Sequence, residues 1–401
     1  MTNRGPSDAS SFPSPASRWR DAPAPGLSFP YMAWAHTHSA RTSHPLTQSG
    51  MPPADPSFLE ALGHARDLDH AGSEALPALE DALARRYGVP RSRVIVTMGA
   101  SGGMYLAAAR WFRAGSRVLA DVPSYEPFRV LPRGMGAEFL PLERRMEERF
   151  GVDPERVRAR LARGSGPGHV FLSNPHNPTG AMLDAGTLRA IAREAERAGG
   201  VMVSCDIYME YVPAARAAWA HAAGPNAVTI GSLTKAYGLG SLRVGWMILG
   251  EGLEHERPHL IDAAYMTWVD PPTCTLRAGA AALARLAALR APLDRVERES
   301  RPIWARWLAS TSGIEAFVPE HGIIAFPRVD GVEDTLALSE HLVAEHGVDV
   351  VPGEFFGAPG HVRVGCGLPP ARLEEGLARL DRGIRAFRAA RASSRSAGPL
   401  P

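Results

Sequence analysis

Short apolar runs alternate with longer amphipathic segments between residues 90 and 250. The runs are rich in β-branched residues and apolar throughout, which is typical of strands buried on both faces of a sheet. Seven runs are predicted as strands: Arg93–Thr97, Arg117–Asp121, Glu138–Pro141, His169–Leu172, Val201–Ser204, Ala227–Ile230 and Val244–Leu249. Segments with helical spacing, such as Met104–Phe112 and Ala185–Ala198, lie between several of them. This alternation predicts an α/β domain with a mostly parallel sheet.

The pattern changes in the C-terminal third of the chain. From Cys274 to about Ser310 it is helical and rich in Ala, Leu and Arg, which predicts a long connecting helix. Beyond it we expect a smaller α+β unit. Its strands are predicted near Ile314–Val318, Ile323–Pro327 and Val362–Gly365, and its helices near Thr335–His346 and Pro370–Ala389.

Composition narrows the class of protein. The 401 residues, 45% of them hydrophobic, suffice for two domains with a large core. With 44 basic and 42 acidic side chains, no balance typical of nucleic-acid binding is present. Cys205, Cys274 and Cys366 lack the spacing of a disulfide framework or zinc site, which favours a reducing cytoplasm. No apolar segment is long enough for a bilayer and no histidine pattern suits a metal, so we expect neither membrane nor metal.

The run Ser232–Trp246 carries the strongest chemical signal. Lys235 directly follows Thr234 and lies three positions after a second hydroxyl residue, Ser232, and Arg243 follows across a glycine-bearing loop. Lysine is rare in this chain, and unlike arginine it loses its proton near neutral pH once it is desolvated. An amine of that kind forms a Schiff base with a carbonyl or with pyridoxal phosphate. The segment therefore indicates amine chemistry at Lys235.

This segment resembles the lysine segment of the class I/II aminotransferases, which are pyridoxal-phosphate enzymes of fold type I. The run Asn174–Gly180, with the sequence Asn-Pro-His-Asn-Pro-Thr-Gly, is a full match to another signature of that family. The resemblance implies that Lys235 carries the cofactor and that Ser232 and Arg243 bind its phosphate. It also implies a seven-stranded large domain, a smaller α+β domain and a homodimer with active sites at the subunit interface.

The resemblance and the composition of the two ends divide the chain into five parts. Both ends are rich in Ser and Pro, so we expect them to be disordered. The predicted parts are a disordered segment 1–26, an arm of the small domain 27–55, a large cofactor-binding domain 56–290, a small domain 291–391 and a flexible tail 392–401.

A glycine-rich turn at Gly99–Gly103 follows a predicted strand and opens a helix. Small residues let backbone N–H groups approach an oxyanion, and the helix dipole favours negative charge there. Such a turn alone is often only structural. Together with the lysine segment, and because it resembles the family's phosphate turn, it predicts a phosphate cradle made by Ala100, Ser101 and Gly102.

Two residues are candidates for contact with the cofactor ring. Tyr125 follows the next strand, and a ring there can stack on a pyridine, which is worth about 1 kcal/mol beyond area burial. The alternative is a core tyrosine at a strand end. Asn177 lies between two Asn-Pro turns at a strand end, where α/β folds bind ligands. Its amide is expected to donate to the cofactor's phenolate oxygen and to lie near the substrate.

The segment after the fifth predicted strand leaves one assignment open. An acidic partner at the ring nitrogen keeps the ring protonated as an electron sink, and the family places this aspartate three positions before a tyrosine. Asp206 lies only two positions before Tyr208, and an alignment without gaps puts Cys205 at the aspartate position. We favour Asp206, with Tyr208 or, alternatively, Tyr211 donating to the phenolic oxygen. Asp206→Ala is then expected to cost several orders of magnitude in turnover, and Cys205→Ser little.

Arg363 is an arginine inside an otherwise apolar strand. A partly buried arginine needs an anionic partner, and its planar fork suits a carboxylate. The resemblance implies that this partner is the substrate's α-carboxylate; the alternative is a structural ion pair with a nearby Glu. Gly50 is a weaker candidate for approaching the same carboxylate through its backbone.

Three functions are open at this stage. The first is an aminotransferase that moves an amino group from an amino acid to a 2-oxo acid, with Lys235 as the base. The second is a lyase, cyclase or replacement enzyme, because the runs Pro175–Gly180, Lys235–Leu239 and Val351–Gly357 also resemble capreomycidine synthases, which are arginine-derived cyclases. The third is a binding protein without catalysis, which Cys205 at the aspartate position would favour.

Overall fold

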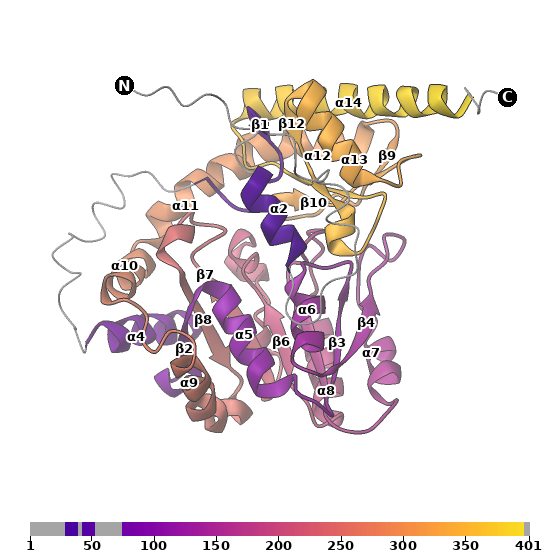
Figure 1. Ribbon diagram of the computed structural model, residues 1–401. Coiled ribbons are helices and arrows are strands. Elements are labelled where there is room, and N and C mark those ends of the chain that lie inside the picture. The colour runs from indigo at the N-terminus through magenta and orange to yellow at the C-terminus, as the bar shows by residue number, and fades with distance from the viewer. Residues whose placement is uncertain (1–28, 39–41, 53–73, 397–401) are drawn as a thin grey trace, which may run out of the picture.

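The computed structural model describes residues 29–38, 42–52 and 74–396 (Figure 1). Its large sheet has seven strands in the order β2-β8-β7-β6-β5-β3-β4. They are β2 (Val94–Met98), β3 (Arg117–Val122), β4 (Glu138–Glu143), β5 (Gly168–Ser173), β6 (Met202–Cys205), β7 (Ala227–Ser232) and β8 (Val244–Leu249). Strand β8 is antiparallel to both neighbours, and the other pairs are parallel. The predicted seven strands and mostly parallel sheet are confirmed.

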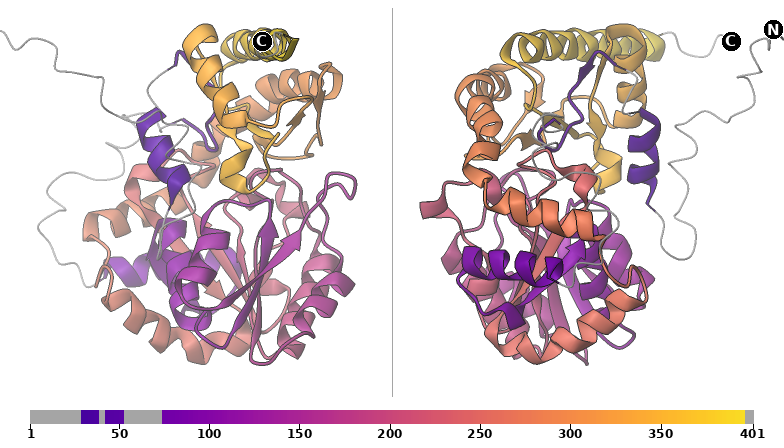
Figure 2. Two further views of the ribbon diagram at one scale, coloured as in Figure 1. Left: turned by 45° about the vertical axis from the view of Figure 1, so that its right-hand side comes forward. Right: turned by 90° about the vertical axis from the view of Figure 1, so that its left-hand side faces the viewer.

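Helices cover both faces of this sheet (Figure 2). In β3, Val118 and Ala120 pack in one cluster with residues of α5, α6 and α9, whereas Leu119 packs in another with α7 and α8. Successive side chains of a strand point to opposite faces, so a sheet covered on both sides needs apolar residues at every position. The helices of this part are α4 (Ala75–Tyr87), α5 (Gly99–Trp111), α6 (Pro127–Gly134), α7 (Pro154–Leu161), α8 (Ala185–Arg197), α9 (Arg257–Tyr265) and α10 (Thr273–Leu283).

The predicted long helix is divided into several helical pieces. After α10 follow α11 (Leu286–Arg295), a π-helical turn η8 (Val296–Ser300) and α12 (Arg301–Ser310). The smaller unit beyond them consists of β9 (Ile314–Glu315), β10 (Ile324–Ala325), β11 (Arg328–Val329), α13 (Thr335–His341), β12 (Val348–Asp349), β13 (Val351–Pro352), β14 (Val362–Gly365) and α14 (Pro370–Ser396). Its strands form a sheet in the order β10-β14-β13 and the pair β9–β11, and β12 pairs with β1 (His44–Pro45) from the beginning of the chain.

Helix α14 lies across the end of the smaller unit (Figure 1). It continues to Ser396, past residue 392, where we expected the tail to begin. None of the helices in the described ranges combines the length and the apolar character needed to cross a membrane. The predicted disordered segment 1–26 lies outside the described residues, and the domain boundaries stay predictions.

The N-terminal arm contacts the smaller unit. It consists of α2 (Pro30–His38) and β1 (His44–Pro45), which pairs in parallel with β12. The N–H of Leu46 donates to Asp349 Oδ1 at 3.1 Å. Tyr31 of α2 packs against Phe355 and Phe356, with ring centroids 5.8 and 5.9 Å away. The arm thereby brings residues from the beginning of the chain to the junction between sheet and smaller unit (Figure 1).

Candidate active site

A cavity of about 210 Å³ is lined by residues of the large sheet, the arm and the smaller unit. It lies beyond the carboxyl ends of β5, β6 and β7, which is where open α/β sheets bind ligands. The predicted site residues on its wall are Ala100, Ser101, Tyr125, Asn177, Tyr208, Ser232, Lys235, Arg243 and Arg363. Gly50, Gly102 and Asp206 were predicted with them but do not line it.

Lys235 follows β7 and points into this cavity. Its Nζ donates to the Ser49 hydroxyl at 2.9 Å. Its carbonyl accepts hydrogen bonds from the Met51 N–H and the Tyr211 hydroxyl, both at 2.8 Å. Burial, with help from the positive charge of Arg363, lowers the pKa of Lys235 to about 8. An amine with this pKa is partly neutral near physiological pH, so it can act as a nucleophile or a base.

Gly50 packs against the backbone of Lys235. A Cβ atom on Gly50 would lie 3.2 Å from both Cδ and the carbonyl oxygen of Lys235. The arm reaches the cavity through the neighbouring residue Ser49 instead. The contact predicted between Gly50 and a substrate carboxylate therefore stays a prediction.

The glycine-rich turn and Arg243 meet at the N-terminus of α5. Arg243 has a left-handed backbone (φ 54°), which is uncommon for a residue with a side chain and is found where surrounding structure imposes it. A Cβ atom on Gly99 would lie 2.6 Å from Nη2 of Arg243, and one on Gly245 would lie 2.3 Å from the carbonyl carbon of Gly99. The two glycines thus allow Arg243 to approach the helix N-terminus, where anions bind favourably.

Hydroxyl groups gather at the same end of the cavity. Ser101 and Ser232 both line it, and the Ser232 hydroxyl donates to Thr234 Oγ1 at 2.7 Å. Gly102 does not line the cavity, and a Cβ atom there would be 3.1 Å from the ring of Trp268. Backbone N–H groups, hydroxyls and a guanidinium together form a cradle suited to a phosphate.

Arg363 of β14 contributes a second guanidinium to the wall. It is 1% exposed, and it donates to Asn177 Oδ1 at 3.1 Å, to the Tyr31 hydroxyl at 2.8 Å and to the Thr47 carbonyl at 3.1 Å. Its Nε is buried without a partner. All of these partners are neutral, so the ion pair with a nearby Glu is not found among the described residues. A buried cation without an acid is costly, and an anionic ligand would remove this cost.

Asn177 and Tyr125 come from neighbouring loops that are joined by their backbones. The Tyr125 N–H donates to the Asn177 carbonyl at 3.2 Å. The Tyr125 ring meets Tyr31 edge-on, with centroids 5.9 Å apart, and its hydroxyl contacts Met32 Sδ at 3.3 Å. Tyr125 lines the cavity, and its stacking on a cofactor ring stays a prediction.

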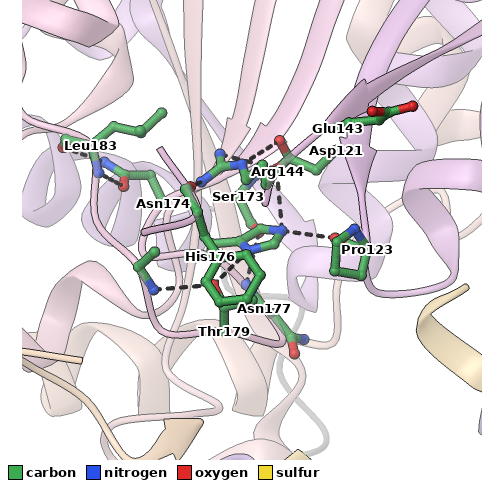
Figure 3. A network of polar contacts seen from close by, with 12 residues as sticks. Asp121, Pro123, Glu143, Arg144, Ser173, Asn174, His176, Asn177, Thr179 and Leu183 are labelled. Carbon is green, nitrogen blue, oxygen red and sulfur yellow. Dashed lines mark hydrogen bonds and ion pairs between the residues drawn. The ribbon is translucent and has the colours of Figure 1, made fainter. Parts of the chain in front are cut away.

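A buried polar network holds the Asn174–Gly180 loop from behind (Figure 3). The His176 ring contacts the Pro123 carbonyl at 2.9 Å and the Thr179 hydroxyl at 2.7 Å. Beside it, Asp121 and Arg144 form a fully buried ion pair at 2.7 Å. Burial keeps the pKa of His176 well below its usual value, so the ring is neutral. This network fixes the loop that carries Asn177, whose N–H in turn donates to the Ser173 hydroxyl at 3.0 Å.

Tyr208 brings an unpaired hydroxyl to the cavity. The residue is 2% exposed, and its hydroxyl makes no hydrogen bond of regular geometry with another described residue. Burial raises the pKa of Tyr208 to about 12, while Arg363 and the Ser49 hydroxyl act to lower it. Because buried hydroxyls are normally paired, this donor points to a ligand atom.

The arrangement at the end of β6 reverses our expectation for Asp206 and Cys205. Cys205 lines the cavity, whereas Asp206 does not. Both oxygens of the Asp206 carboxylate are engaged elsewhere: they accept from the Ser204 hydroxyl, from the Ala220 N–H at 3.0 Å and from the Thr229 hydroxyl at 2.8 Å. Side chains of a strand alternate between faces, so Asp206 follows Ser204 away from the cavity and Cys205 faces it.

The sheet and the cavity are those expected of a pyridoxal-phosphate enzyme of fold type I. The family model for aminotransferase class I and II matches residues 61–380. The chain therefore belongs to the class I and II aminotransferase family, whose cofactor is pyridoxal phosphate.

Three similar proteins illustrate the range of this family. The chain is 31% identical to capreomycidine synthase of Streptomyces vinaceus, over 79% of this chain and 82% of the relative. It is 28% identical to arginine–pyruvate transaminase AruH of Pseudomonas aeruginosa, again over 79% and 82%. The crystal structure of the PLP-dependent cyclase OrfR matches with a TM-score of 0.78 and 26% identity, over 94% of this chain and 100% of that one.

The described residues fit this cofactor. The cradle at α5 closes around Gly99, where any side chain would displace the Arg243 guanidinium. The Tyr208 hydroxyl makes no hydrogen bond of regular geometry with another described residue, although the Ser49 hydroxyl lies near it. A phosphate would fit the cradle, and a phenolic oxygen would accept a hydrogen bond from the Tyr208 hydroxyl. Lys235 supplies the amine in the same cavity.

Among the polar residues of the wall, sequence reasoning missed Tyr31, and it considered Ser49 only together with Gly50 as a weaker candidate. Both lie in the arm and reach the cavity only through tertiary packing. Ser49 had a weak signal because it precedes Gly50, which was considered. Tyr31 had none.

Proposed function

We propose that this protein is a pyridoxal-phosphate enzyme that removes the Cα proton of a free α-amino acid. The observation that carries this proposal is the pairing of two groups in one cavity. Arg363 is a buried guanidinium without a carboxylate partner among the described residues, and Lys235 is a buried amine whose pKa is lowered to about 8. One suits the α-carboxylate of an amino acid and the other suits its Cα proton.

The remaining residues would hold the cofactor. We assign its attachment to Lys235 and its phosphate to Ser101, Ser232, Arg243 and the N-terminus of α5. When bound, the cofactor supplies an electron-withdrawing ring that stabilises negative charge at Cα.

We assign contacts with the cofactor ring and its phenolic oxygen to three further residues. The Tyr208 hydroxyl and the Asn177 amide would bind the phenolic oxygen, and Tyr125 would cover one face. These assignments are supported by the common cavity and by the unpaired Tyr208 hydroxyl.

Two reactions are compatible with this machinery. Aminotransfer from an amino acid to a 2-oxo acid is supported by the family and by the similarity to AruH. Cyclisation, elimination or replacement is supported by the similarity to capreomycidine synthase and OrfR, and by Cys205 on the cavity wall. Arginine belongs in any substrate panel, because the name of the transaminase relative contains it.

The sequence offers a sharp test of the assignment of Lys235, because it is the only lysine in the 401 residues. Borohydride reduction of the holoenzyme should fix the cofactor on one peptide, the one containing residue 235, as read by mass spectrometry. Lys235→Arg keeps the positive charge but lacks a usable amine, so it should bind no cofactor covalently and should lose the visible absorbance band. A cofactor fixed at the N-terminus, or an unchanged band in Lys235→Arg, would contradict the assignment.

A half-reaction distinguishes the two reactions. The holoenzyme is mixed with one amino acid at a time, without a 2-oxo acid, and the products and the cofactor are analysed. Aminotransfer yields a 2-oxo acid and leaves the cofactor aminated, whereas elimination or cyclisation returns the cofactor unchanged. Cofactor binding without turnover of any amino acid would support the third possibility, a binding protein.

We also propose a homodimer in the cytoplasm, as is typical of the family. The exposed large apolar side chains of the described residues include Tyr265, Met266 and Val269, which form one short segment. Trp268 of the same segment packs on Gly102 beside the cavity. A dimer interface there would bury these side chains. Light scattering after size exclusion should give twice 43.0 kDa, and a monomeric holoenzyme would contradict the proposal.

A further inference from the structure

Cys205 is the last residue of β6, and its side chain forms part of the cavity wall. It is 3% exposed and lies near enough to Lys235, Tyr125 and Tyr208 to interact with them electrostatically. The thiol therefore lies among the residues assigned to the amine, to the ring face and to the phenolic oxygen. It has no part in the cofactor contacts proposed above.

The cavity offers no acid in place of this thiol. None of the described residues that line it is an aspartate or a glutamate. The nearest acid in sequence, Asp206, has both oxygens engaged by Ser204, Ala220 and Thr229. It would have to give up these three hydrogen bonds and cross to the other face of the strand to reach the cavity.

The thiol is uncharged. Burial raises the pKa of Cys205 to about 12, the charge of Asp206 acts in the same direction, and Lys235 opposes it only weakly. A neutral thiol is a weak donor and a weak acceptor, so it cannot hold a positive charge as a carboxylate does.

A second observation shows that this part of the cavity is built for a ligand. The hydroxyl of Tyr208, three positions after Cys205, lies on the same wall, is 98% buried and has no regular hydrogen-bond partner among the described residues. A polar group left unpaired at this depth is uncommon unless a bound molecule completes it. Cys205 therefore borders a ligand position, although its side chain also packs at the edge of the apolar cluster between the sheet and α5.

We propose that Cys205 stands where pyridoxal-phosphate chemistry uses an acidic partner for the ring nitrogen, and that its thiol leaves this nitrogen unprotonated. The inference rests on the proposed function and decides between its two reactions. An unprotonated ring accepts electrons less readily. The chain therefore favours reactions in which a leaving group takes an electron pair from the substrate, over aminotransfer, in which the cofactor itself must take up the pair.

The favoured substrates are then amino acids with a leaving group on Cβ. In elimination the Cα proton passes to the Lys235 amine, and the electrons of the broken C–H bond form a double bond between Cα and Cβ. The leaving group departs with the electron pair of its own bond. A nitrogen of the same substrate can then add to Cβ and lose its proton, while Cα regains one. The ring closes with no oxidant or reductant, and the leaving group is released with a proton.

The protonation state of the ring is measured directly on the holoenzyme. Cofactor labelled with ¹⁵N at the ring nitrogen is bound to the wild-type protein, to Cys205→Ser and to Cys205→Asp, and its NMR shift is read at pH 7 without substrate. We expect the unprotonated shift in the wild type and in Cys205→Ser, which is the matched neutral control. Cys205→Asp should give the protonated shift. A protonated ring in the wild type would overturn the inference, as would an unprotonated ring in Cys205→Asp.

Product partition is the second readout. Each variant receives the amino acid that reacts fastest in the half-reaction panel, and the fraction of turnovers that leave the cofactor aminated is counted. In Cys205→Asp the ratio of aminated to unchanged cofactor should rise roughly tenfold or more, which corresponds to about 1.4 kcal/mol between the two barriers. An unchanged fraction would refute the link between Cys205 and reaction type. If Cys205→Asp does not fold, the wild-type shift alone still decides the protonation state.

Failure of the proposed function would look different. It would show as absent cofactor binding, or as absent turnover in the wild type, before any variant is compared. A wild type that binds the cofactor, turns over an amino acid and holds a protonated ring would leave the proposed function standing and remove only this inference.

Discussion

Replacing Asp206 by Asn tests whether its carboxylate is structural. Burial raises the pKa of Asp206 from 3.8 to about 7, although Ser204, Ala220 and Thr229 donate hydrogen bonds that act to lower it. The folded protein therefore holds this proton more tightly than the unfolded chain does. Stability from this group is fully present below about pH 4 and is lost as the pH rises through about 7.

The magnitude follows from the two pKa values. At about 1.4 kcal/mol for each pKa unit, the rise from 3.8 to about 7 corresponds to about 4 kcal/mol of lost stability across this pH interval. Asn does not ionise, and its amide can keep all three contacts because the Ser204 hydroxyl can accept as well as donate. The stability of Asp206→Asn relative to wild type should therefore increase with pH. Asp206→Ala, which leaves three donors without an acceptor, should instead lose about 3 to 6 kcal/mol.

Urea unfolding of the holoenzymes at pH 5, 6, 7 and 8, at one cofactor concentration, provides the measurement. Turnover is measured on the same samples. We expect Asp206→Asn to keep turnover within roughly tenfold of wild type, since its side chain lies outside the cavity. A folded Asp206→Asn protein that loses several orders of magnitude in turnover would refute the reasoning and return Asp206 to the ring nitrogen. Parallel stability curves for the two proteins would refute the raised pKa.

Three further predictions concern the rest of the site. Arg363→Lys should raise the KM for the amino acid roughly tenfold to a hundredfold with the cofactor absorbance unchanged, because a planar fork is replaced by a point charge; an unchanged KM would exclude Arg363 as the carboxylate contact. The rate of cofactor uptake by the apoprotein should increase with pH up to about 8, because only the neutral Lys235 amine attacks; a rate independent of pH between 6 and 8 would contradict the lowered pKa. His176→Ala should lower the free energy of unfolding by about 2 to 4 kcal/mol, since it unpairs buried groups and leaves a cavity. Thr179→Ser should change this free energy by less than about 1 kcal/mol, because the hydroxyl stays. Equal effects of the two substitutions in urea unfolding would show that the His176 ring does not support the loop.

The sheet could be predicted from sequence because its strands are buried on both faces. Apolar runs such as Val244–Leu249 have no other place in a domain of this size, and the loops after them carry the motifs. Most of the predicted site residues then line one cavity, because the ends of parallel strands converge.

The features of the site that could not be predicted from sequence depend on the placement of single residues. Cys205 and Asp206 are adjacent, and a shift of one residue exchanges the two faces of a strand, so no pattern of composition decides between them. The structure decides through Ser204 and Thr229, whose hydroxyls hold the Asp206 carboxylate on the far face. Tyr31 and Arg363 are 332 positions apart, and only the folded arm brings them together.

Asn177, Tyr31 and Thr47 accept hydrogen bonds from Arg363, so they compete with any ligand for its guanidinium. An incoming molecule must displace some of these neutral partners before it reaches the guanidinium. A carboxylate would more than replace the lost hydrogen bonds, because its negative charge binds the guanidinium more strongly than a neutral oxygen does. The neutral amide or ester of the same amino acid would not. If Arg363 binds the substrate carboxylate as proposed, the site would therefore discriminate against blocked amino acids and peptide carbonyls, because part of the guanidinium is already hydrogen-bonded to uncharged neighbours and only a charged ligand gains by replacing them.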